Sequence, residues 1–525
     1  MFMGKSRDQP ATSGSPRASV RTRLGRVLID VAFIRDPGIV GSILKWAASV
    51  VLALADGTSR RRQLRGRRVW NGLSRRRVRP DSPKKVAVVG PRARAVLSAG
   101  GVHTRLDGSD IDVVVVDSHA DAEGVIQPTV VLSAHPNLAV PAFDPREHNP
   151  IGWCRRVANR IAALGPLHEL PRGIDAQYVL NARNIDLIRH CHHVEDVESY
   201  HANLTERVGT LVRLAARGTP IHVVDGDPRL APLLGTQLFD LLTAEIGDAD
   251  DTTRELHSIR MRRLALKDHT IERRFRQICG IALKDPPVVP SVSIILATNR
   301  PEFLPWAIAN VHKQNYPRLE LILALHGDHF DHATVEHAIG PLSCPFEVVR
   351  IDGENSFPVV LNAATAAANG ELVTKMDDDD LYDEHHVWDL VLALDYSGAH
   401  LVGKGAEIVY LQRRDQTIER YRNQAETYSR NVAGGTRLIA RDHVDAIGGW
   451  QGVPPRVDWT LIDNVIRSGG LVYKTHGTGY VLIRHGQRHS WNADDDYFLD
   501  GATTIHDGWC PDIAGIDALP QGIPA

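Results

Sequence analysis

Short apolar runs recur through the middle of the chain, and polar or glycine-containing segments separate them. The runs are 86–89, 111–117, 129–133, 185–188 and 220–224. Runs of this length that are rich in valine are typical of strands buried in parallel sheets. Helix-length segments lie between some of them, and this alternation predicts a Rossmann-like α/β domain, which we assign to 84–285. No GxGxxG motif follows Gly90, so the pattern gives little support for dinucleotide binding.

A second set of alternating elements begins after 290. Residues 252–281 read as a charged helical segment, and the proline-rich stretch 284–290 ends it, because proline stops helices and stiffens linkers. We therefore place the main domain boundary at 285/286. Beyond it we expect strands and helices in alternation, and Gly370 after the last helix is a favourable helix-terminating residue. The strands are expected at 291–297, 319–325, 346–351 and 372–376, and the helices at 303–314 and 358–369.

Four consecutive aspartates, 377–380, follow the last of these strands. Alternation along a strand would direct Asp377 and Asp379 to one side and the two other aspartates to the opposite side. Adjacent carboxylates repel one another unless they share a cation, and hard oxygen ligands suit Mg²⁺ or Mn²⁺. In open α/β sheets, ligands lie at the carboxyl ends of strands. The loops 298–301 and 325–329 also lie at such ends, so we expect them to converge with the aspartates on one cleft.

The N-terminal segment, 1–83, is basic, and its first 20 residues have the composition of a disordered chain. It contains an apolar stretch, 39–55, with arginines on both sides. The stretch is slightly short for a bilayer span, which needs about 20 residues. Two interpretations stay open: a helix lying on an anionic membrane surface, and a helix that docks on the protein core beside a basic tail.

Composition places the protein among ordinary globular chains, with 43% hydrophobic and 24% charged residues and a net charge of −2. Its length of 525 residues predicts two or three domains. Five scattered cysteines without a CxxC motif fit a reducing compartment, and we see no signal peptide. We therefore expect a cytoplasmic protein, or one bound peripherally to the inner face of the cytoplasmic membrane, with no nucleic-acid partner.

Residues 290–500 resemble a family 2 glycosyltransferase of GT-A fold. The resemblance rests on 293–301, on the helix from Asn362 to Gly370 that leads to the four aspartates, on Ile447-Gly-Gly-Trp450, and on Val457-Asp-Trp-Thr-Leu461. The resemblance implies a fold class of α/β, with a GT-A domain (a Rossmann-like mixed sheet) at 286–525. The second Rossmann-like α/β domain and the basic segment would precede it. Residues 175–245 also resemble, loosely, the nucleotide-side half of GT-B-type glycosyltransferases, including the spore-maturation-type group.

The family resemblance also implies roles for individual residues. Thr298 and Arg300 would line the nucleotide pocket, Asp377 would face the ribose or the metal, and Asp379 would bind the metal that bridges the diphosphate. The family's usual segment after the second strand is replaced by Leu325-His-Gly-Asp-His329, which puts the base-recognition role of Asp328 in doubt.

The family's Glu-Asp pair appears here as Val457-Asp458, which leaves Asp458 as the expected catalytic base. A single carboxylate that deprotonates the acceptor hydroxyl implies inversion at the sugar. Apolar neighbours predict that burial raises the pKa of Asp458. The alternative is that Asp458 caps a helix that begins near Thr460.

A late segment of the chain carries two histidines, His485 and His489, close together. In several GT-A enzymes a histidine from this region completes the metal shell, and imidazole is an acceptable ligand for Mn²⁺. Arg484 or Arg488 would suit the diphosphate, because arginine binds phosphate oxygens with two parallel N–H groups.

The sequence thus predicts a metal-dependent, inverting transferase that moves a sugar from a nucleoside-diphosphate sugar to a hydroxyl acceptor. The acceptor would be a glycan or lipid-linked, as in the synthesis of cell-envelope glycans or polysaccharides. Two alternatives stay open. One is a sugar-nucleotide nucleotidyltransferase, although the loop 298–301 lacks the glycine-rich form usual there. The other is a non-catalytic glycan-binding scaffold.

Overall fold

The computed structural model of the chain describes the parts that carry the predicted domains. The described residues are 86–89, 113–116, 129–140, 142–145, 173–175, 193–246, 249–284, 289–421, 425–452, 457–485 and 493–516. All of them belong to one compact unit. The segment 1–83 with its apolar stretch 39–55, the predicted strand 185–188, the boundary 285/286, Arg488 and His489 lie outside the described residues. Among the described helices, none is both long enough and apolar enough to cross a membrane.

Two small parallel sheets lie in the N-terminal half. The first has the order β1 (Val86–Val89), β2 (Val113–Val116) and β3 (Thr129–Val131), and the second has the order β4 (Gly173–Asp175), β5 (His193–Asp196) and β6 (Ile221–Val223). Helices α7 (Leu204–Ala216), α8 (Ala231–Leu234) and α9 (Thr236–Thr243) accompany the second sheet. The predicted strands near 86, 113, 129 and 221 are confirmed, and the parallel pairing agrees with a second Rossmann-like α/β region.

The charged helical segment predicted at 252–281 is two helices, α10 (Asp251–Asp268) and α11 (Ile271–Leu283). The break falls at His269 and Thr270, where the backbone pairs with a distant residue instead of continuing the helix. The N–H of Phe143 donates to the carbonyl of His269 (3.2 Å), and the N–H of Ile271 donates to the carbonyl of Phe143 (3.0 Å). The backbone groups at the break thus find hydrogen-bond partners at Phe143, and the sequence pattern alone does not reveal this pairing.

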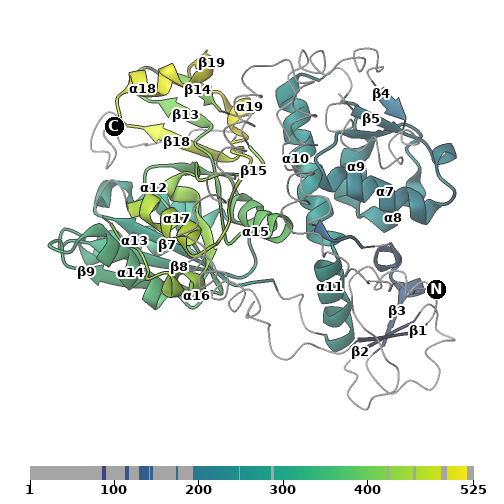
Figure 1. The fold of residues 1–525 in the computed structure, drawn as a ribbon, viewed down its shortest axis with the longest axis horizontal. Helices are drawn as coiled ribbons and strands as arrows, with labels where there is room; N and C mark the ends of the chain where they lie inside the picture. The colour runs from purple at the N-terminus through teal and green to yellow at the C-terminus, as the bar shows by residue number, and fades with distance from the viewer. Residues whose placement is uncertain are drawn as a thin grey trace, which may run out of the picture. The chain divides into compact units, whose positions relative to one another are not determined.

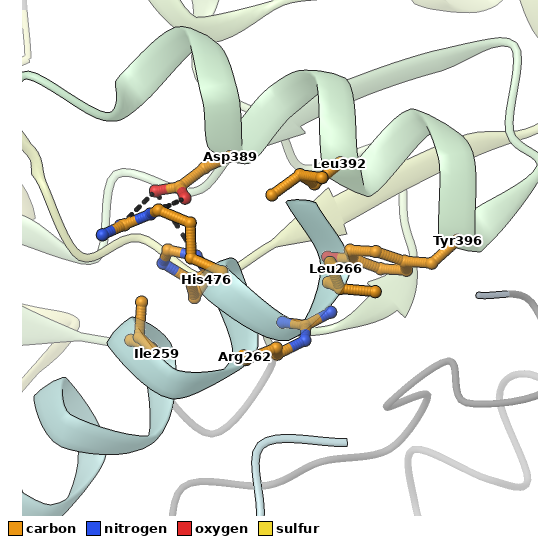
Figure 2. Close-up of a pocket in the computed structure, with 8 residues that line it drawn as sticks. Ile259, Arg262, Leu266, Asp389, Leu392, Tyr396 and His476 are labelled. Carbon is orange, nitrogen blue, oxygen red and sulfur yellow. Dashed lines mark hydrogen bonds and ion pairs between the residues drawn. The ribbon is translucent and has the colours of Figure 1, made fainter. Parts of the chain in front are cut away.

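Helix α10 packs against α7 and α9 on one side and against α15 (His386–Ser397) on the other. Buried ion pairs hold it there: Arg262 Nη1 lies 2.6 Å from Glu426 Oε1, and Arg263 Nε lies 2.8 Å from Asp389 Oδ1. Between these pairs is a cavity of about 10 Å³, lined by Arg262, Asp389, Tyr396 and other side chains of both helices (Figure 2). A space of this size holds about one water molecule, so it is a packing gap and not a ligand site.

The C-terminal half is built on an eight-stranded mixed sheet (Figure 1). Its strand order is β15 (Thr427–Tyr428), β17 (Val472–Thr475), β12 (Leu401–Lys404), β16 (Leu438–Ala440), β10 (Leu372–Met376), β7 (Val292–Thr298), β8 (Leu319–His326) and β9 (Phe346–Ile351). Strands β10, β7, β8 and β9 are parallel, whereas β16 runs antiparallel between β10 and β12. The central strands are buried along their length, as their continuous apolar runs predict.

Helices α12 (Leu304–His312), α13 (His332–Ile339), α14 (Phe357–Ala367) and α16 (Arg441–Ala446) each follow a strand of this sheet, and α17 (Val457–Arg467) precedes β17. One apolar core joins the sheet to α14 and α17.

A separate five-stranded sheet has the order β11 (Leu381–Tyr382), β18 (Tyr480–Arg484), β13 (Ile408–Leu411), β14 (Gln416–Arg420) and β19 (Ala502–Asp507). The short helices α18 (Asp495–Asp500) and α19 (Pro511–Ala514) lie near the end of the described chain. The four aspartates connect the two sheets, because they lie between β10 of the large sheet and β11 of the small one. The predicted α/β class with a GT-A domain in the C-terminal half is confirmed.

Candidate active site

The four aspartates form a turn after β10 and not part of the strand. They still separate into the two pairs that alternation predicts. The side chains of Asp377 and Asp379 are 29% and 16% exposed, whereas Asp378 and Asp380 are buried. Two carboxylates of the turn therefore face accessible space, and the two others hold the turn in place.

Asp378 is bound by the loop that follows β7. Thr298 Oγ1 donates to Asp378 Oδ2 (2.5 Å), and Arg300 donates to the same carboxylate through Nε (3.1 Å) and Nη2. Arg300 Nη2 also lies 2.9 Å from Asp379 Oδ2. The two residues that the family resemblance assigns to the nucleotide pocket thus meet the acidic turn directly. Burial and the charge of Asp379 raise the pKa of Asp378 to about 6, against the opposing effect of Arg300.

Asp380 fixes the other side of the turn. Its carboxylate accepts hydrogen bonds from the Tyr480 hydroxyl (2.8 Å) and from the N–H of Ile483 (3.2 Å). Its carbonyl accepts from Trp306 Nε1 (3.0 Å) and Asn310 Nδ2 (2.9 Å). Four contacts on one residue leave the turn little freedom to move, so Asp377 and Asp379 are presented on a rigid support.

The predicted base, Asp458, lies beside the acidic turn, with a buried lysine between them. Lys375 Nζ donates to Asp377 Oδ1 and lies 3.9 Å from Asp458 Oδ2. Arg437 Nη1 lies 2.9 Å from Asp458 Oδ1. Lys375 and Arg437 are buried, and Asp458 is 27% exposed. The structure therefore brings Asp377, an expected ligand of the ribose or the metal, and the predicted base Asp458 together around the side chains of Lys375 and Arg437.

The expected rise in the pKa of Asp458 is wrong. Burial does act to raise this pKa, but the positive charges of Lys375 and Arg437 outweigh it, so the pKa lies below its ordinary value. Asp458 also does not lie where a helix cap would, because α17 begins one residue earlier, at Val457. A carboxylate in the first turn of a helix is stabilised as an anion by the backbone N–H groups there.

Two glycines that sequence reasoning missed lie against these carboxylates. A Cβ on Gly434 would collide with Asp458 Oδ2, and a Cβ on Gly435 would lie 2.7 Å from Asp377 Oδ2 and 2.5 Å from the Tyr382 hydroxyl. Any side chain at either position would displace a carboxylate. Lys375 is a third missed residue. Its signal is a lone lysine in a buried strand two residues before the aspartates, where apolar side chains are usual.

Among the remaining predicted residues, His485 contacts the same turn. His485 Nε2 is 2.9 Å from the carbonyl oxygen of Asp379, and its Nδ1 is 3.1 Å from Gln412 Oε1. Asp328 is exposed on the loop after β8, whose neighbour His329 contacts the carbonyl of Asn299 (2.7 Å). Arg484 packs its guanidinium over the ring of Phe498 at 4.9 Å.

A divalent cation would find hard oxygen donors here. Asp377 and Asp379 are partly exposed carboxylates on one rigid turn, and cationic side chains of the chain itself, Lys375 and Arg300, already compensate their charge. Among the described residues, however, no three histidine, cysteine or acidic side chains converge as a complete metal-binding set. The donor chemistry thus fits Mg²⁺ or Mn²⁺ with these two aspartates as protein ligands, and it leaves other positions for water or phosphate oxygens.

Comparison with known proteins identifies the domain. Residues 293–448 match the family model described as glycosyl transferase family 2. Similar solved structures include the mannosyltransferase PcManGT from Pyrobaculum calidifontis in complex with GDP-Man and Mn²⁺ (17% identity, TM-score 0.30, 39% of this chain and 62% of that one). Another is TarS 1–349 of S. aureus in complex with UDP-GlcNAc (13% identity, TM-score 0.32, 40% of this chain and 64% of that one). The chain thus spans less than two thirds of the length of either.

No curated protein matches the chain. The matched family segment runs from β7 through the four aspartates to α16, so it contains most of the site described above. Residues 293–448 are therefore similar to glycosyl transferase family 2, and they lie within the mixed α/β fold described above.

Proposed function

We propose that the chain transfers a sugar from a nucleoside-diphosphate sugar to a hydroxyl acceptor, with inversion at the anomeric carbon. The observation that carries this proposal is the placement of Asp458 beside Asp377 around Lys375. One carboxylate is then available for proton transfer, next to the turn that would receive the leaving diphosphate. A nucleotidyltransferase or a binding scaffold has no need of an ionised carboxylate at this place.

The reaction needs one displacement. Asp458 accepts the proton of the acceptor hydroxyl as its oxygen forms the new bond to the anomeric carbon. The bond from that carbon to the diphosphate oxygen breaks, and the electron pair leaves with the nucleoside diphosphate. Because the lowered pKa of Asp458 keeps it ionised near neutral pH, the base is ready before substrates bind. Inversion follows because the hydroxyl and the leaving group lie on opposite faces of the sugar.

Asp377 and Asp379 would hold the Mg²⁺ or Mn²⁺ ion that the family resemblance implies. When bound, such an ion neutralises charge that develops on the departing diphosphate. Arg300, which lies against Asp378 and Asp379, would likewise neutralise negative charge on the diphosphate. Thr298 and Arg300 thereby orient the acidic turn toward the donor, and Asp328 lies on the adjacent loop.

Replacement of Asp458 by asparagine tests the proposal. Asn keeps the shape of the side chain but accepts no proton, so the single-turnover rate should fall about 10²–10⁴-fold. Donor affinity, measured by calorimetry, should change far less. The matched control is Asp445→Asn, which alters an exposed carboxylate on the neighbouring helix α16. If Asp458→Asn turns over within a few-fold of wild type, Asp458 is not the base; a large loss in Asp463→Asn alone would assign the base to Asp463.

The donor is identified by screening nucleotide sugars for metal-dependent release of nucleoside diphosphate. Release of pyrophosphate from a nucleoside triphosphate and a sugar phosphate would instead indicate a nucleotidyltransferase. Glycan binding without release of either product would indicate a scaffold. The three functions thus give three different outcomes: release of nucleoside diphosphate, release of pyrophosphate, and glycan binding without release of either.

We further propose that the enzyme works on cell-envelope glycan or lipid-linked acceptors at an anionic membrane surface, through the arginine-flanked stretch 39–55. This proposal rests on sequence alone. Liposome flotation of the full chain should show recovery that salt weakens, because each basic residue contributes about 1 kcal/mol near a charged surface. Equal recovery on neutral and anionic vesicles would contradict it.

A further inference from the structure

An exposed tryptophan, Trp459, directly follows the proposed base. Its side chain is 43% exposed, whereas Val457, Leu461, Ile462 and Val465 of the same helix are buried in the core. Tryptophan is highly buried on average, so an exposed indole next to the proposed base is a candidate contact for a ligand. The core does not use this ring, so packing gives no reason for its presence.

The segment 430–435, which follows β15, contacts both Trp459 and the carboxylates of the site. Gly435 lies against Asp377, Gly434 lies against Asp458, and the guanidinium of Arg430 lies 5.9 Å from the centre of the Trp459 ring. Within the six residues 430–435, the contacts thus pass from Asp377 on the donor side to the proposed base Asp458 and then to Trp459. A substrate whose hydroxyl reaches Asp458 from the side away from the donor would extend toward Trp459.

One charged side chain, that of Arg430, lies over a face of the Trp459 ring. Arg430, which lies over it, also forms an ion pair with Asp463, one turn along α17 from Trp459. Because Asp463 compensates the charge of Arg430, the surface offers an apolar ring and a neutral ion pair. This chemistry suits an uncharged ligand with C–H groups on one face and hydroxyl groups at its edge.

We propose that Trp459 is an acceptor subsite that binds the face of a pyranose ring and presents one of its hydroxyls to Asp458. The acceptor is then a carbohydrate, and not a polypeptide side chain or a lipid alcohol. This inference rests on the proposed function, since it uses Asp458 as the base. The apolar C–H face of a sugar ring packs on the indole, and Arg430 and Asp463 supply hydrogen-bonding groups at its rim.

A binding experiment that does not depend on turnover tests the subsite. The full-length protein is labelled with 5-fluorotryptophan, and the ¹⁹F resonance of Trp459 among the nine tryptophans is assigned with Trp459→Phe. A panel of methyl glycosides and short oligosaccharides is then titrated. We expect at least one glycoside to shift the Trp459 resonance in a saturable way. If no glycoside moves it, or if only fatty alcohols or serine peptides do, the carbohydrate assignment is overturned.

Kinetics provide the second measurement. Trp459→Ala should raise the KM for a carbohydrate acceptor about tenfold or more with a much smaller change in donor KM, and Trp459→Phe should restore part of the loss. The control is Tyr497→Ala, which removes a similarly exposed aromatic ring from α18. Equal effects of Trp459→Ala and Tyr497→Ala on acceptor KM would overturn the subsite. Absence of nucleoside-diphosphate release in the wild type from every donor would instead defeat the proposed function, while the ¹⁹F titration still reports on Trp459.

Discussion

Lys375 and Asp458 lie on different elements, β10 and α17, and the lysine Nζ is 3.9 Å from Asp458 Oδ2. The same ammonium donates to Asp377. Two carboxylates with different proposed tasks, donor binding and proton transfer, are therefore held by one buried cation. The arrangement keeps Asp458 ionised, because the charges of Lys375 and Arg437 lower its pKa against the effect of burial.

Removal of this cation should change the pH dependence of the reaction. A base is active only when ionised, so activity falls as the pH drops through the pKa of Asp458. In Lys375→Met that pKa rises, and the acidic limb of the kcat/KM profile should move to higher pH by about one unit. Lys474→Met is the control, because it removes another buried lysine, which pairs with Glu407 and not with the site. An acidic limb that stays in place in Lys375→Met would contradict a role for this lysine in tuning the base.

The contact of Gly434 with Asp458 gives a second prediction. A methyl group at this position would push the carboxylate aside, and a displacement of about 1 Å in a catalytic group costs about 10²-fold in rate. Gly434→Ala should therefore lower the single-turnover rate by roughly that factor, with donor affinity and unfolding free energy little changed. Gly340→Ala is the control, since a Cβ there meets only helix carbonyls at 3.5 Å. Equal rates in the two variants would show that the glycine is not needed by the base.

Asp379 should determine the response to metal. Asp379→Asn keeps the size of the side chain but loses the charge that would attract a divalent cation, so activity should fall steeply and respond weakly to added Mn²⁺. The fold should persist, because Arg300 keeps its contacts with Asp378. Asp352→Asn, which alters an exposed carboxylate directly after β9, serves as the control. A normal Mn²⁺ titration in Asp379→Asn would remove this residue from the metal site.

Local pattern was enough to predict the strands and the acidic turn. The runs that became β7, β8 and β10 are mostly apolar because both faces of these strands are largely buried, and such runs are visible in any sequence. The position of Asp377 and Asp379 at the end of β10 followed from the same pattern. The separation of the aspartates into exposed and buried pairs was also predictable, since neighbouring side chains tend to point in different directions.

The surroundings of Asp458 were not predictable in this way. Lys375 and Arg437 are 62 positions apart and meet because β16 pairs antiparallel with β10. Sequence neighbours such as Val457 and Trp459 suggested an apolar setting, but the residues that decide the pKa come from other elements. The glycines at 434 and 435 likewise have no local signal, because their role is to leave room for carboxylates that other segments supply.

Arg262 provides the last prediction, which concerns the stability of the C-terminal domain. It lies on α10, outside the segment that matches the family model, and three groups contact its guanidinium. Arg262 Nη1 is 2.6 Å from Glu426 Oε1, Nε donates to the carbonyl of Ala216 at 3.1 Å, and the group lies 4.3 Å from the centre of the Tyr396 ring. Glu426 is fully buried and also accepts from the hydroxyls of Tyr396 and Tyr473.

Loss of one partner of a buried ion pair leaves the other charge without compensation, which costs about 3–5 kcal/mol. Arg262→Met should therefore lower the free energy of unfolding of the full chain by that order, and the double variant Arg262→Met/Glu426→Gln should recover part of the loss, because no charge is then left alone. The control is Arg276→Met, which breaks a pair with the largely exposed Glu272 one helical turn away. Exposed pairs of this spacing contribute only about 0.3–0.5 kcal/mol.

Urea denaturation followed by intrinsic fluorescence measures the free energy of unfolding of the wild type and the three variants. A cost for Arg262→Met no larger than that for Arg276→Met would show that α10 is dispensable to the transferase domain; the expected larger cost would make α10 part of its folding unit.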